Sequence, residues 1–451
     1  MPSSKKKIVL FWFRRDLRLH DNAGLYHALK SGYPVLPMFV LDSDILSKLQ
    51  DPADARVTFI HDSLTSLQST LASMGSSLLV RHGKPLDVWK SLLSEYDIAD
   101  VHTNRDYEPS AIARDHAVAE LLSAHGIGFQ THKDHVIFEG DEVLKDDGKP
   151  YTVFTPYSRK WKAKLESGKQ GNGPSFYFKS YPSEKHLDRL LQTPPLPMPT
   201  LQDIGFQRSR IQIPSMEVAA GIIKNYNETR DFPAIAGTSR LGIHFRFGTV
   251  SIREKARKAE HLNTTYLNEL IWRDFYSMIL QHFPHVVDGP FRPQYAAIQW
   301  RNDEGEFDAW CKGETGYPIV DAGMRELNAT GFMHNRVRMI TASFLAKHLL
   351  IDWRWGEAYF AEKLLDFDLA SNNGGWQWAA GCGTDAAPYF RIFNPESQQQ
   401  KFDSKFQYIK HWVPEFGTPR YVKPIVDHKM SRERCLTVYK AGLGGIDVES
   451  E

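Results

Sequence analysis

The fold of the second half of the chain is decided by the stretch from Gly331 to Phe393, which reads GFMHNRVRMITASFLAKHLLIDWRWGEAYFAEKLLDFDLASNNGGWQWAAGCGTDAAPYFRIF. Apolar residues recur at helical spacing in residues 339–350 and again in residues 359–365, which predicts two helices on either side of a turn at residues 352–356. The second helix is expected to end at residues 372–375, because the Asn-Asn-Gly-Gly there tolerates the left-handed backbone that closes a helix. Arginines, aspartates and four tryptophans share the stretch, so we expect it to hold a large, flat and polar ligand.

Length and composition narrow the class of protein. A chain of 451 residues exceeds what one hydrophobic core usually serves, so two domains are expected. An apolar content of 42% without a long apolar run indicates a globular protein and disfavours membrane spans. The three cysteines are an odd number without close spacing, which argues against disulfides or a metal site. The basic residues 5–7 lead into a strand-like run and not into a signal peptide, so we expect a cytoplasmic protein. We also expect it to be a monomer.

The first part of the chain alternates apolar runs with amphipathic helices. The runs cover residues 8–13, 33–42, 76–83, 100–105 and 127–138, and the helical patterns cover residues 55–74, 85–95 and 110–125. This alternation predicts a doubly wound α/β sheet. Since no GxGxxG loop follows the first strand, a dinucleotide bound in the Rossmann manner is not expected. Proline at Thr193–Thr200 predicts an extended connector, so we expect an α/β domain at residues 1–138, an interdomain linker at residues 139–203 and a helical domain at residues 204–451.

Several polar patterns in the helical part have more than one interpretation. The loop AGTSRLG at residues 236–242 offers hydroxyls and backbone N–H groups at a helix start, which suit a pyrophosphate and equally an ordinary helix cap. The face formed by ELIWRDFY at residues 269–276 is either amphipathic packing or a ligand wall. Asp366 and Asp368 could in isolation bind magnesium, but no third hard ligand accompanies them.

The net charge of +1 neither favours nor excludes nucleic acid as a partner, because such binding depends on local clusters of cations. Cations interleaved with aromatic residues suit a single strand or a flipped base, or else form a solvated face. The cations in question are Arg336, Arg338, Arg391, Lys401, Lys405 and Lys410.

Long motifs carry a resemblance to a known family. They are TGYPIVDAGMREL at residues 315–327, FMHNRVRMITASFL and LLIDWRWGE within the quoted stretch, DLASNNGGWQWAAGCGTDAAPYFRIFNP at residues 368–395, and upstream GTSRL and ELIWRDFY. The chain resembles the DNA photolyases and cryptochromes, most closely the bacterial class I cyclobutane pyrimidine dimer photolyases. The resemblance implies an α/β antenna-binding domain followed by an all-α FAD-binding domain, and light-driven electron transfer from reduced FAD to a dimer flipped out of ultraviolet-damaged DNA.

The resemblance also implies site residues. One FAD per chain would be bound by Tyr226, Thr238, Ser239, Arg240, Leu241, Gly242, Arg338, Asp366, Asp368 and Asn372, although the family often has serine at the position of Gly242. Glu269, Asn335 and Asn372 would take part in the reaction. The lesion or its DNA would be contacted by Glu269, Trp272, Arg273, Tyr276, Asn335, Arg336, Met339, Trp378 and Gln398.

Electron transfer and light harvesting are implied in the same way. Trp300, Trp353 and Trp376 match the electron-transfer triad of the family, although tryptophans in a helical domain are more often core residues. The segment at residues 104–109 resembles the one that lines the antenna site in deazaflavin-binding relatives, with Arg56, Asp106 and Glu108 as candidates. An 8-hydroxy-deazaflavin is therefore preferred over methenyltetrahydrofolate, FMN or an empty site.

Two alternatives concern the activity itself. A cryptochrome-type light receptor would share the fold and the FAD without repair, and a nucleotide-binding module on the N-terminal sheet is a more distant alternative. The lesion-facing residues, and the lack of a long tail past Ile446, favour repair. The related (6-4) photolyases carry two histidines four residues apart where this chain has Asn335 and Met339, and His334 would point roughly 100° away from that helical position. We therefore expect repair of cyclobutane dimers and not of (6-4) lesions.

Overall fold

The computed structural model describes residues 6–171, 173–386 and 388–444. The prediction that no long tail follows Ile446 concerns residues outside these ranges. Within this range the chain forms two compact units. Unit 1 comprises residues 6–142, 161–216 and 240–261, and unit 2 comprises residues 143–160, 217–239 and 262–444. Each unit thus includes part of the 139–203 segment and part of the chain after it, and the domain limits at 138 and 203 stay a prediction.

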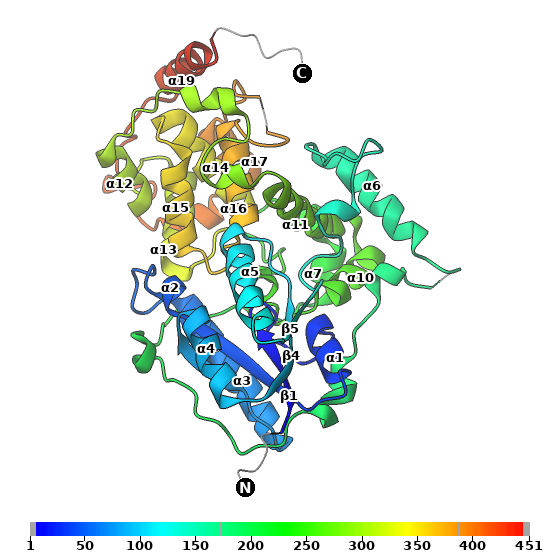
Figure 1. Ribbon diagram of the computed structural model, residues 1–451. Coiled ribbons are helices and arrows are strands. Elements are labelled where there is room, and N and C mark those ends of the chain that lie inside the picture. Colours follow the sequence, from blue (N-terminus) through cyan, green and yellow to red (C-terminus); the bar gives the residue numbers. More distant parts are fainter. Residues whose placement is uncertain (1–5, 172, 387, 445–451) are drawn as a thin grey trace. The chain divides into compact units, whose positions relative to one another are not determined.

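Unit 1 is built on a five-stranded parallel sheet with the strand order β3-β2-β1-β4-β5 (Figure 1). The strands are β1 (Ile8–Phe13), β2 (Val35–Asp42), β3 (Leu79–Gly83), β4 (Ile98–Asn104) and β5 (Gly128–His132). The helices packed on the sheet include α1 (Ala23–Leu29), α3 (Ala55–Ser73), α4 (Pro85–Glu95) and α5 (Pro109–Ser123). Alternate residues of β1 face opposite sides: Phe11 packs with α1 and α3, and Trp12 packs with α4 and α5. This confirms the predicted doubly wound α/β fold.

Residues 240–261 belong to unit 1 because of buried ion pairs. Arg253 on α10 (Ile252–Leu262) reaches Asp21 at 3.0 Å and Asp134 at 2.8 Å, and all three side chains are almost completely buried. Asp134 also pairs with Arg18 at 2.7 Å. Because removing one member would leave an uncompensated buried charge, these pairs hold α10 to the sheet.

Unit 2 is almost entirely helical. It contains the first half of α6 (Phe154–Ser167), and then α7 (Ala220–Lys224), α8 (Tyr226–Thr229), α11 (Thr264–His282), α12 (Glu304–Lys312), α13 (Pro318–Thr330), α14 (Asn335–Ser343), a π-helical turn (Phe344–Leu349), α15 (Trp353–Lys363), α16 (Leu369–Ala380), α17 (Pro395–Phe402), α18 (Gln407–Trp412) and α19 (His428–Gly442). The short α2 (Ser43–Leu46) and α9 (Gly242–Arg246) belong to unit 1. The mostly helical remainder confirms the predicted second fold class.

Two local predictions in the quoted stretch are wrong. Residues 352–356 are no turn between helices, since Asp352 caps α15 by accepting a hydrogen bond from the Arg354 N–H and the helix begins at Trp353. Residues 372–375 do not end a helix but lie inside α16. Gly374 is needed there for a close approach, because a Cβ atom at this position would lie 2.2 Å from the ring of Tyr276.

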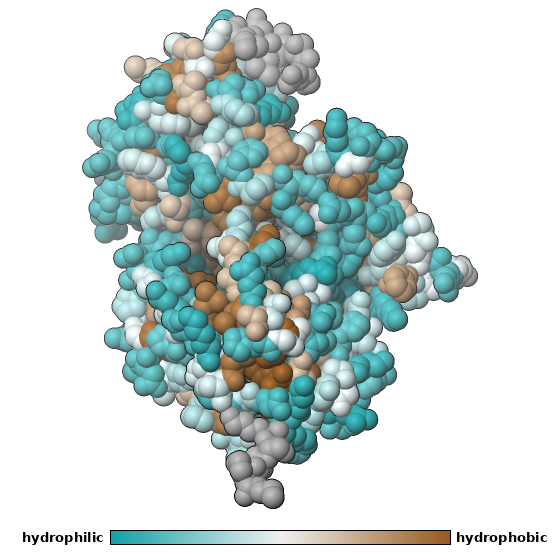
Figure 2. All heavy atoms as spheres, in the orientation of Figure 1, coloured by the Kyte–Doolittle hydropathy of each residue, from teal (hydrophilic) through white to brown (hydrophobic). Residues whose placement is uncertain are grey.

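Hydrophilic side chains cover most of the face seen in Figure 2. Within the described part of the chain, no helix combines the length and the apolar character that a membrane crossing requires.

Candidate functional site

A cavity of about 430 Å³ opens in unit 2, between α11, α14, α15 and α16. Its volume lies in the range of small-molecule and cofactor pockets. Twelve of the residues singled out from the sequence line it: Glu269, Trp272, Arg273, Tyr276, Asn335, Arg338, Met339, Asp366, Asp368, Asn372, Trp376 and Trp378. The fold thus places residues that are far apart in the sequence together in the wall of this cavity.

A cation and a carboxylate form the polar side of the cavity. The Nη2 atom of Arg338 donates to both carboxylate oxygens of Asp366, at 3.1 and 3.0 Å, and its Nε atom donates to the carbonyl of Met333 at 2.7 Å. Because three of its hydrogen bonds are fixed, the guanidinium of Arg338 is held in one orientation on α14. It can therefore present positive charge to an anionic ligand.

The start of α16 supplies an amide and an open backbone surface. Asn372 donates its amide N–H to the carbonyl of Glu357 at 3.1 Å, which leaves its amide oxygen as an acceptor. Asp368 caps the helix and accepts from the N–H and the hydroxyl of Ser371, both at 3.1 Å. At Gly375 an added Cβ would meet nothing within 4 Å, so the cavity reaches the backbone there.

An ion pair between Arg230 and Glu269, which was not predicted from the sequence, forms another side of the cavity. Arg230, just after α8, donates to Glu269 on α11. Burial raises the pKa of Glu269, and the charge of Arg230 opposes this shift. The guanidinium of Arg230 also lies 5.5 Å from the ring centroid of Tyr226. Its sequence context, NETRDF, contains no periodicity or motif that would have identified it.

Aromatic rings line the neighbouring wall. Tyr276 lies with its ring against the backbone of Gly374, and burial raises the pKa of its hydroxyl. Trp272 lies one helical turn earlier on α11, with its ring centroid 5.4 Å from that of Tyr276. Trp378 approaches from α16. Such faces can pack on flat bases or rings.

The start of α14 determines which polar groups reach the cavity. His334 is only 3% exposed and caps the helix, because its Nδ1 atom accepts a hydrogen bond from the Arg336 N–H at 3.2 Å. Asn335 and Met339 line the cavity instead. Neither of these two side chains can exchange a proton near neutral pH.

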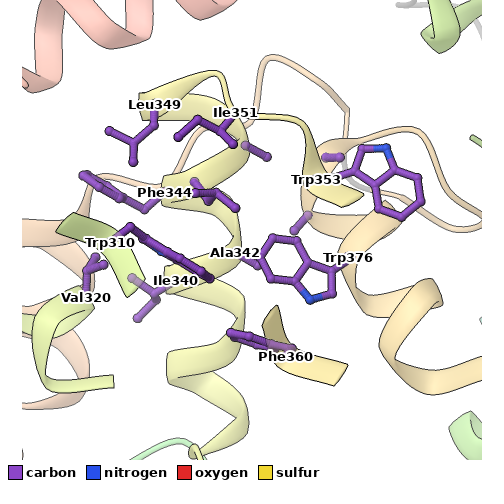
Figure 3. Packing of buried hydrophobic residues seen from close by; sticks show 14 of the residues in the cluster. Trp310, Val320, Ile340, Ala342, Phe344, Leu349, Ile351, Trp353, Phe360 and Trp376 are labelled. Carbon is purple, nitrogen blue, oxygen red and sulfur yellow. The ribbon is translucent and has the colours of Figure 1, made fainter. Parts of the chain in front are cut away.

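Trp376 and Trp353 are core residues as well as candidates for electron transfer. They are 2% and 3% exposed and belong to one hydrophobic cluster (Figure 3). Trp300 packs against this cluster. The ring of Trp376 also meets that of Trp310, with centroids 6.0 Å apart, a contact that the sequence did not indicate. The indole N–H of Trp376 is buried and has no hydrogen-bond partner among the described residues, so this residue of the cavity wall offers an unused donor.

Other predicted residues lie away from the described cavity wall. Arg336 pairs with Asp231 at 2.7 Å, and Gln398 lies on α17. Tyr226 packs edge-on against Tyr266, whose hydroxyl donates to Ser239 at 3.1 Å, next to Thr238. The remaining residues of the loop, Arg240, Leu241 and Gly242, are part of unit 1.

The candidate antenna residues of unit 1 are held by ion pairs. Arg56 pairs with Asp54, while Asp106 and Glu108 both accept from Arg15 at 3.1 Å. Burial alone would raise the pKa of Asp106, but the combined positive charges around it, that of Arg15 the largest among them, lower the pKa. Within the described ranges, no group of three or more His, Cys, Asp or Glu residues could hold a metal ion.

Comparison with known proteins gives concordant results. Residues 266–419 match the family described as the FAD binding domain of DNA photolyase, and residues 9–175 match the family described as DNA photolyase. The chain is 38% identical, over 96% of its length, to the deoxyribodipyrimidine photo-lyases of Halobacterium salinarum and Synechococcus, and the matches cover 99% and 96% of those proteins.

The fold of the chain is also similar to solved structures of photolyases and of a cryptochrome. A bacterial class III photolyase from Agrobacterium tumefaciens matches with a TM-score of 0.80 and 34% identity over 98% of both chains. An archaeal photolyase from Sulfolobus tokodaii, described with two FAD molecules and a novel light-harvesting cofactor, matches with a TM-score of 0.77 and 32% identity over 96% of this chain and 99% of that one. A cryptochrome from Synechocystis matches with a TM-score of 0.81 and 26% identity over 97% and 100%.

Proposed function

The chain belongs to the DNA photolyase family, and we propose that it is a light-dependent repair enzyme that splits cyclobutane pyrimidine dimers in ultraviolet-damaged DNA, with FAD as its cofactor. The observation that supports this best is the cavity between α11, α14, α15 and α16 in unit 2. Its wall joins a cation held by a carboxylate, an amide acceptor, an acid and several aromatic rings, three of them tryptophans.

The described side chains fit a flavin. Arg338, fixed by Asp366, would set a positive charge beside a ring system that carries negative charge, and the Asn372 oxygen would accept a hydrogen bond from a ring N–H. The backbone at Gly375 leaves room for a flat group. When bound and reduced, FAD supplies on illumination the electron that opens the cyclobutane ring, and the electron returns afterwards.

The lesion would meet the other side of the cavity. We propose that the dimer is flipped out of the duplex, where Trp272 and Trp378 pack on its bases and Glu269 forms a hydrogen bond with it. Burial raises the pKa of Glu269, while its ion pair with Arg230 opposes this shift. The proposed DNA contacts are completed by Arg273, Tyr276, Asn335, Arg336, Met339 and Gln398. The proposed path by which oxidised flavin is reduced consists of Trp376, Trp353 and Trp300.

The decisive experiment uses an ultraviolet-irradiated oligothymidine. Loss of dimers is expected under blue light with the reduced protein, and none in the dark. A cryptochrome-type receptor would show a light-induced change of the flavin spectrum without loss of dimers. Dark binding of the irradiated oligonucleotide followed by no loss of dimers in light would refute repair.

We also propose an antenna pigment on unit 1, near Arg56, Asp106 and Glu108, with 8-hydroxy-deazaflavin preferred over methenyltetrahydrofolate or FMN. The ion pairs at these residues already satisfy their charges, so the pigment would have to bind through its ring and through backbone groups. Mass spectrometry of the pigments released from protein made in its native host identifies the chromophore. We further propose that the chain acts as a monomer in the cytoplasm, which light scattering and fractionation of the cells would test.

A further inference from the structure

Behind the cavity wall, one ring outside the cavity lies flat on Trp272. Phe154 is the first residue of α6, and its ring is parallel to the indole of Trp272, with 3.6 Å between centroids and 5° between planes. Phe154 is 9% exposed and is not among the described residues that line the cavity, whereas Trp272 is. Both residues belong to unit 2. The stack therefore supports the indole from behind.

The other neighbours of Trp272 complete its packing. Phe275 meets it edge-on, with centroids 5.6 Å apart, and Tyr276 lies against it at 5.4 Å with a tilt of 31°. Phe154 is itself edge-on to Phe275 at 5.8 Å. Because an indole side chain has two rotatable bonds, a flat partner that covers one face restricts both. Phe154 supplies this flat partner from a different segment of the chain.

The start of α6 lies near a second part of the site. Burial raises the pKa of Asp385, in the loop that follows α16, and the backbone N–H of Phe154 opposes this shift. The charge of the same carboxylate adds to the effect of burial in raising the pKa of the Tyr276 hydroxyl. The start of α6 is therefore close to the segment that follows Trp376 and Trp378.

We propose that Phe154 is a positioning residue, which fixes the indole of Trp272 in the plane that packs on the extruded bases of the dimer. This inference rests on the proposed function, since Trp272 has that task only if the lesion enters the cavity. It assigns a role to a residue of the segment at 139–203, which the sequence indicated only as a linker.

The test compares Phe154→Leu, which keeps an apolar side chain without the flat ring, with Phe154→Tyr, which keeps the ring. Dissociation constants are measured in the dark for an oligonucleotide that contains one thymine dimer and for its undamaged counterpart. Phe154→Leu should weaken binding of the dimer by about two- to tenfold, the range expected for one aromatic pair. Binding of undamaged DNA, flavin content and the repair rate at saturating substrate should stay as in the wild type, and Phe154→Tyr should restore affinity.

A double-mutant cycle distinguishes positioning from general destabilisation. In a Trp272→Leu background, Phe154→Leu should cause no further loss of affinity, because its effect passes through the indole. Phe178→Leu serves as the control, since Phe178 is 1% exposed and lies in unit 1; it should leave the affinity unchanged. Wild-type affinity of Phe154→Leu, or additive losses in the cycle, would overturn the inference. Failure of the wild type itself to bind and repair the dimer would instead refute the proposed function.

Discussion

Asp366 shows how one residue can control the cofactor without touching the reaction. Its carboxylate is the partner of the Arg338 guanidinium, and the two side chains are only 21% and 24% exposed. In Asp366→Ala, Arg338 would keep its charge without a partner and lose its fixed orientation, at a cost of about 1.5–3 kcal/mol for a hydrogen bond to a charged group. We expect at least partial loss of FAD, measured as the ratio of flavin to protein absorbance after gel filtration. Asp366→Glu, which keeps the charge, is the control, and an unchanged ratio in Asp366→Ala would contradict the assignment.

Substitution of Trp376 should distinguish two light-driven reactions, which are photoreduction of the oxidised flavin and repair of the dimer. Trp376 is the proposed ring nearest the flavin, but repair begins from reduced flavin and does not use this path. Trp376→Phe should therefore reduce photoreduction of the oxidised flavin to near background, while repair by chemically reduced protein stays intact. Absorbance during illumination and dimer counting measure the two reactions. Trp310→Phe is a matched control for the loss of a packed indole, because its ring contacts that of Trp376. Photoreduction of Trp376→Phe at the wild-type rate would show that the assignment is wrong.

Asn335 and Met339 bear on the class of lesion. Reversal of a (6-4) lesion requires proton transfer as well as an electron, and histidine is the side chain suited to it near neutral pH. The cavity presents an amide and a thioether at these positions, and His334 is buried as a helix cap. We expect repair of cyclobutane dimers and no turnover of (6-4) lesions, followed by chromatography of each purified lesion after blue light. Restored bases in the (6-4) sample would overturn this.

At the scale of the helix, α16 carries two adjacent glycines with opposite constraints. An alanine inside a helix is normally more stable than glycine by about 0.5–1 kcal/mol. Gly374→Ala would nevertheless be destabilising by about 1–3 kcal/mol, because its Cβ would lie 2.2 Å from the Tyr276 ring. In Gly375→Ala the new Cβ would have no atom within 4 Å, so the variant should be more stable by the amount usual for alanine in a helix. Its methyl group would, however, enter the cavity and weaken FAD binding. Thermal unfolding and flavin titration of both variants test the pair; equal effects on stability would contradict it.

These glycines also show what a sequence can reveal at this scale. Asn-Asn-Gly-Gly suits a helix end locally, but a contact with Tyr276, about a hundred residues earlier in the chain, is what requires Gly374. Strands and amphipathic helices of unit 1 were predictable because their apolar periodicity is local, and most of the cavity wall because its motifs are long. Arg230, Trp310 and Phe154 were not, since tertiary contacts alone place them beside Glu269, Trp376 and Trp272.

At the scale of the whole molecule, buried ionisable groups decide how stability depends on pH. In unit 2, burial lowers the pKa of His348 to about 3, and its Nε2 atom lies 2.8 Å from Nδ1 of His428. Burial raises the pKa of Glu357 to about 7, although a hydrogen bond from Asn373 opposes the shift. His348 therefore stays neutral when an unfolded chain would bind a proton, and Glu357 binds a proton when an unfolded chain would not.

The two groups act in opposite directions over the same range of pH. The stability that depends on neutral His348 is complete above pH 6.5 and is lost as the pH falls toward 3. The penalty of ionised Glu357 is absent below pH 4.5 and grows as the pH rises toward 7. Between pH 4.5 and 6.5 each slope is about 1.4 kcal/mol per pH unit with opposite sign, so their sum is small.

Substitution of His348 or Glu357 alone should reveal the pH dependence of stability that the other group contributes. Glu357→Gln keeps an acceptor for Asn373 and should be more stable than the wild type near pH 7, with an advantage that shrinks on acidification toward pH 4.5. His348→Asn removes the acid-dependent loss, so its stability relative to the wild type should improve as the pH falls from 6.5 to 5. Thermal unfolding of the flavin-loaded proteins at intervals between pH 5 and 7.5 measures both differences, and the double variant should again show a small dependence. Parallel curves for the wild type and either single variant would mean that the group titrates alike in the folded and unfolded chains, and that its burial does not control the stability of unit 2.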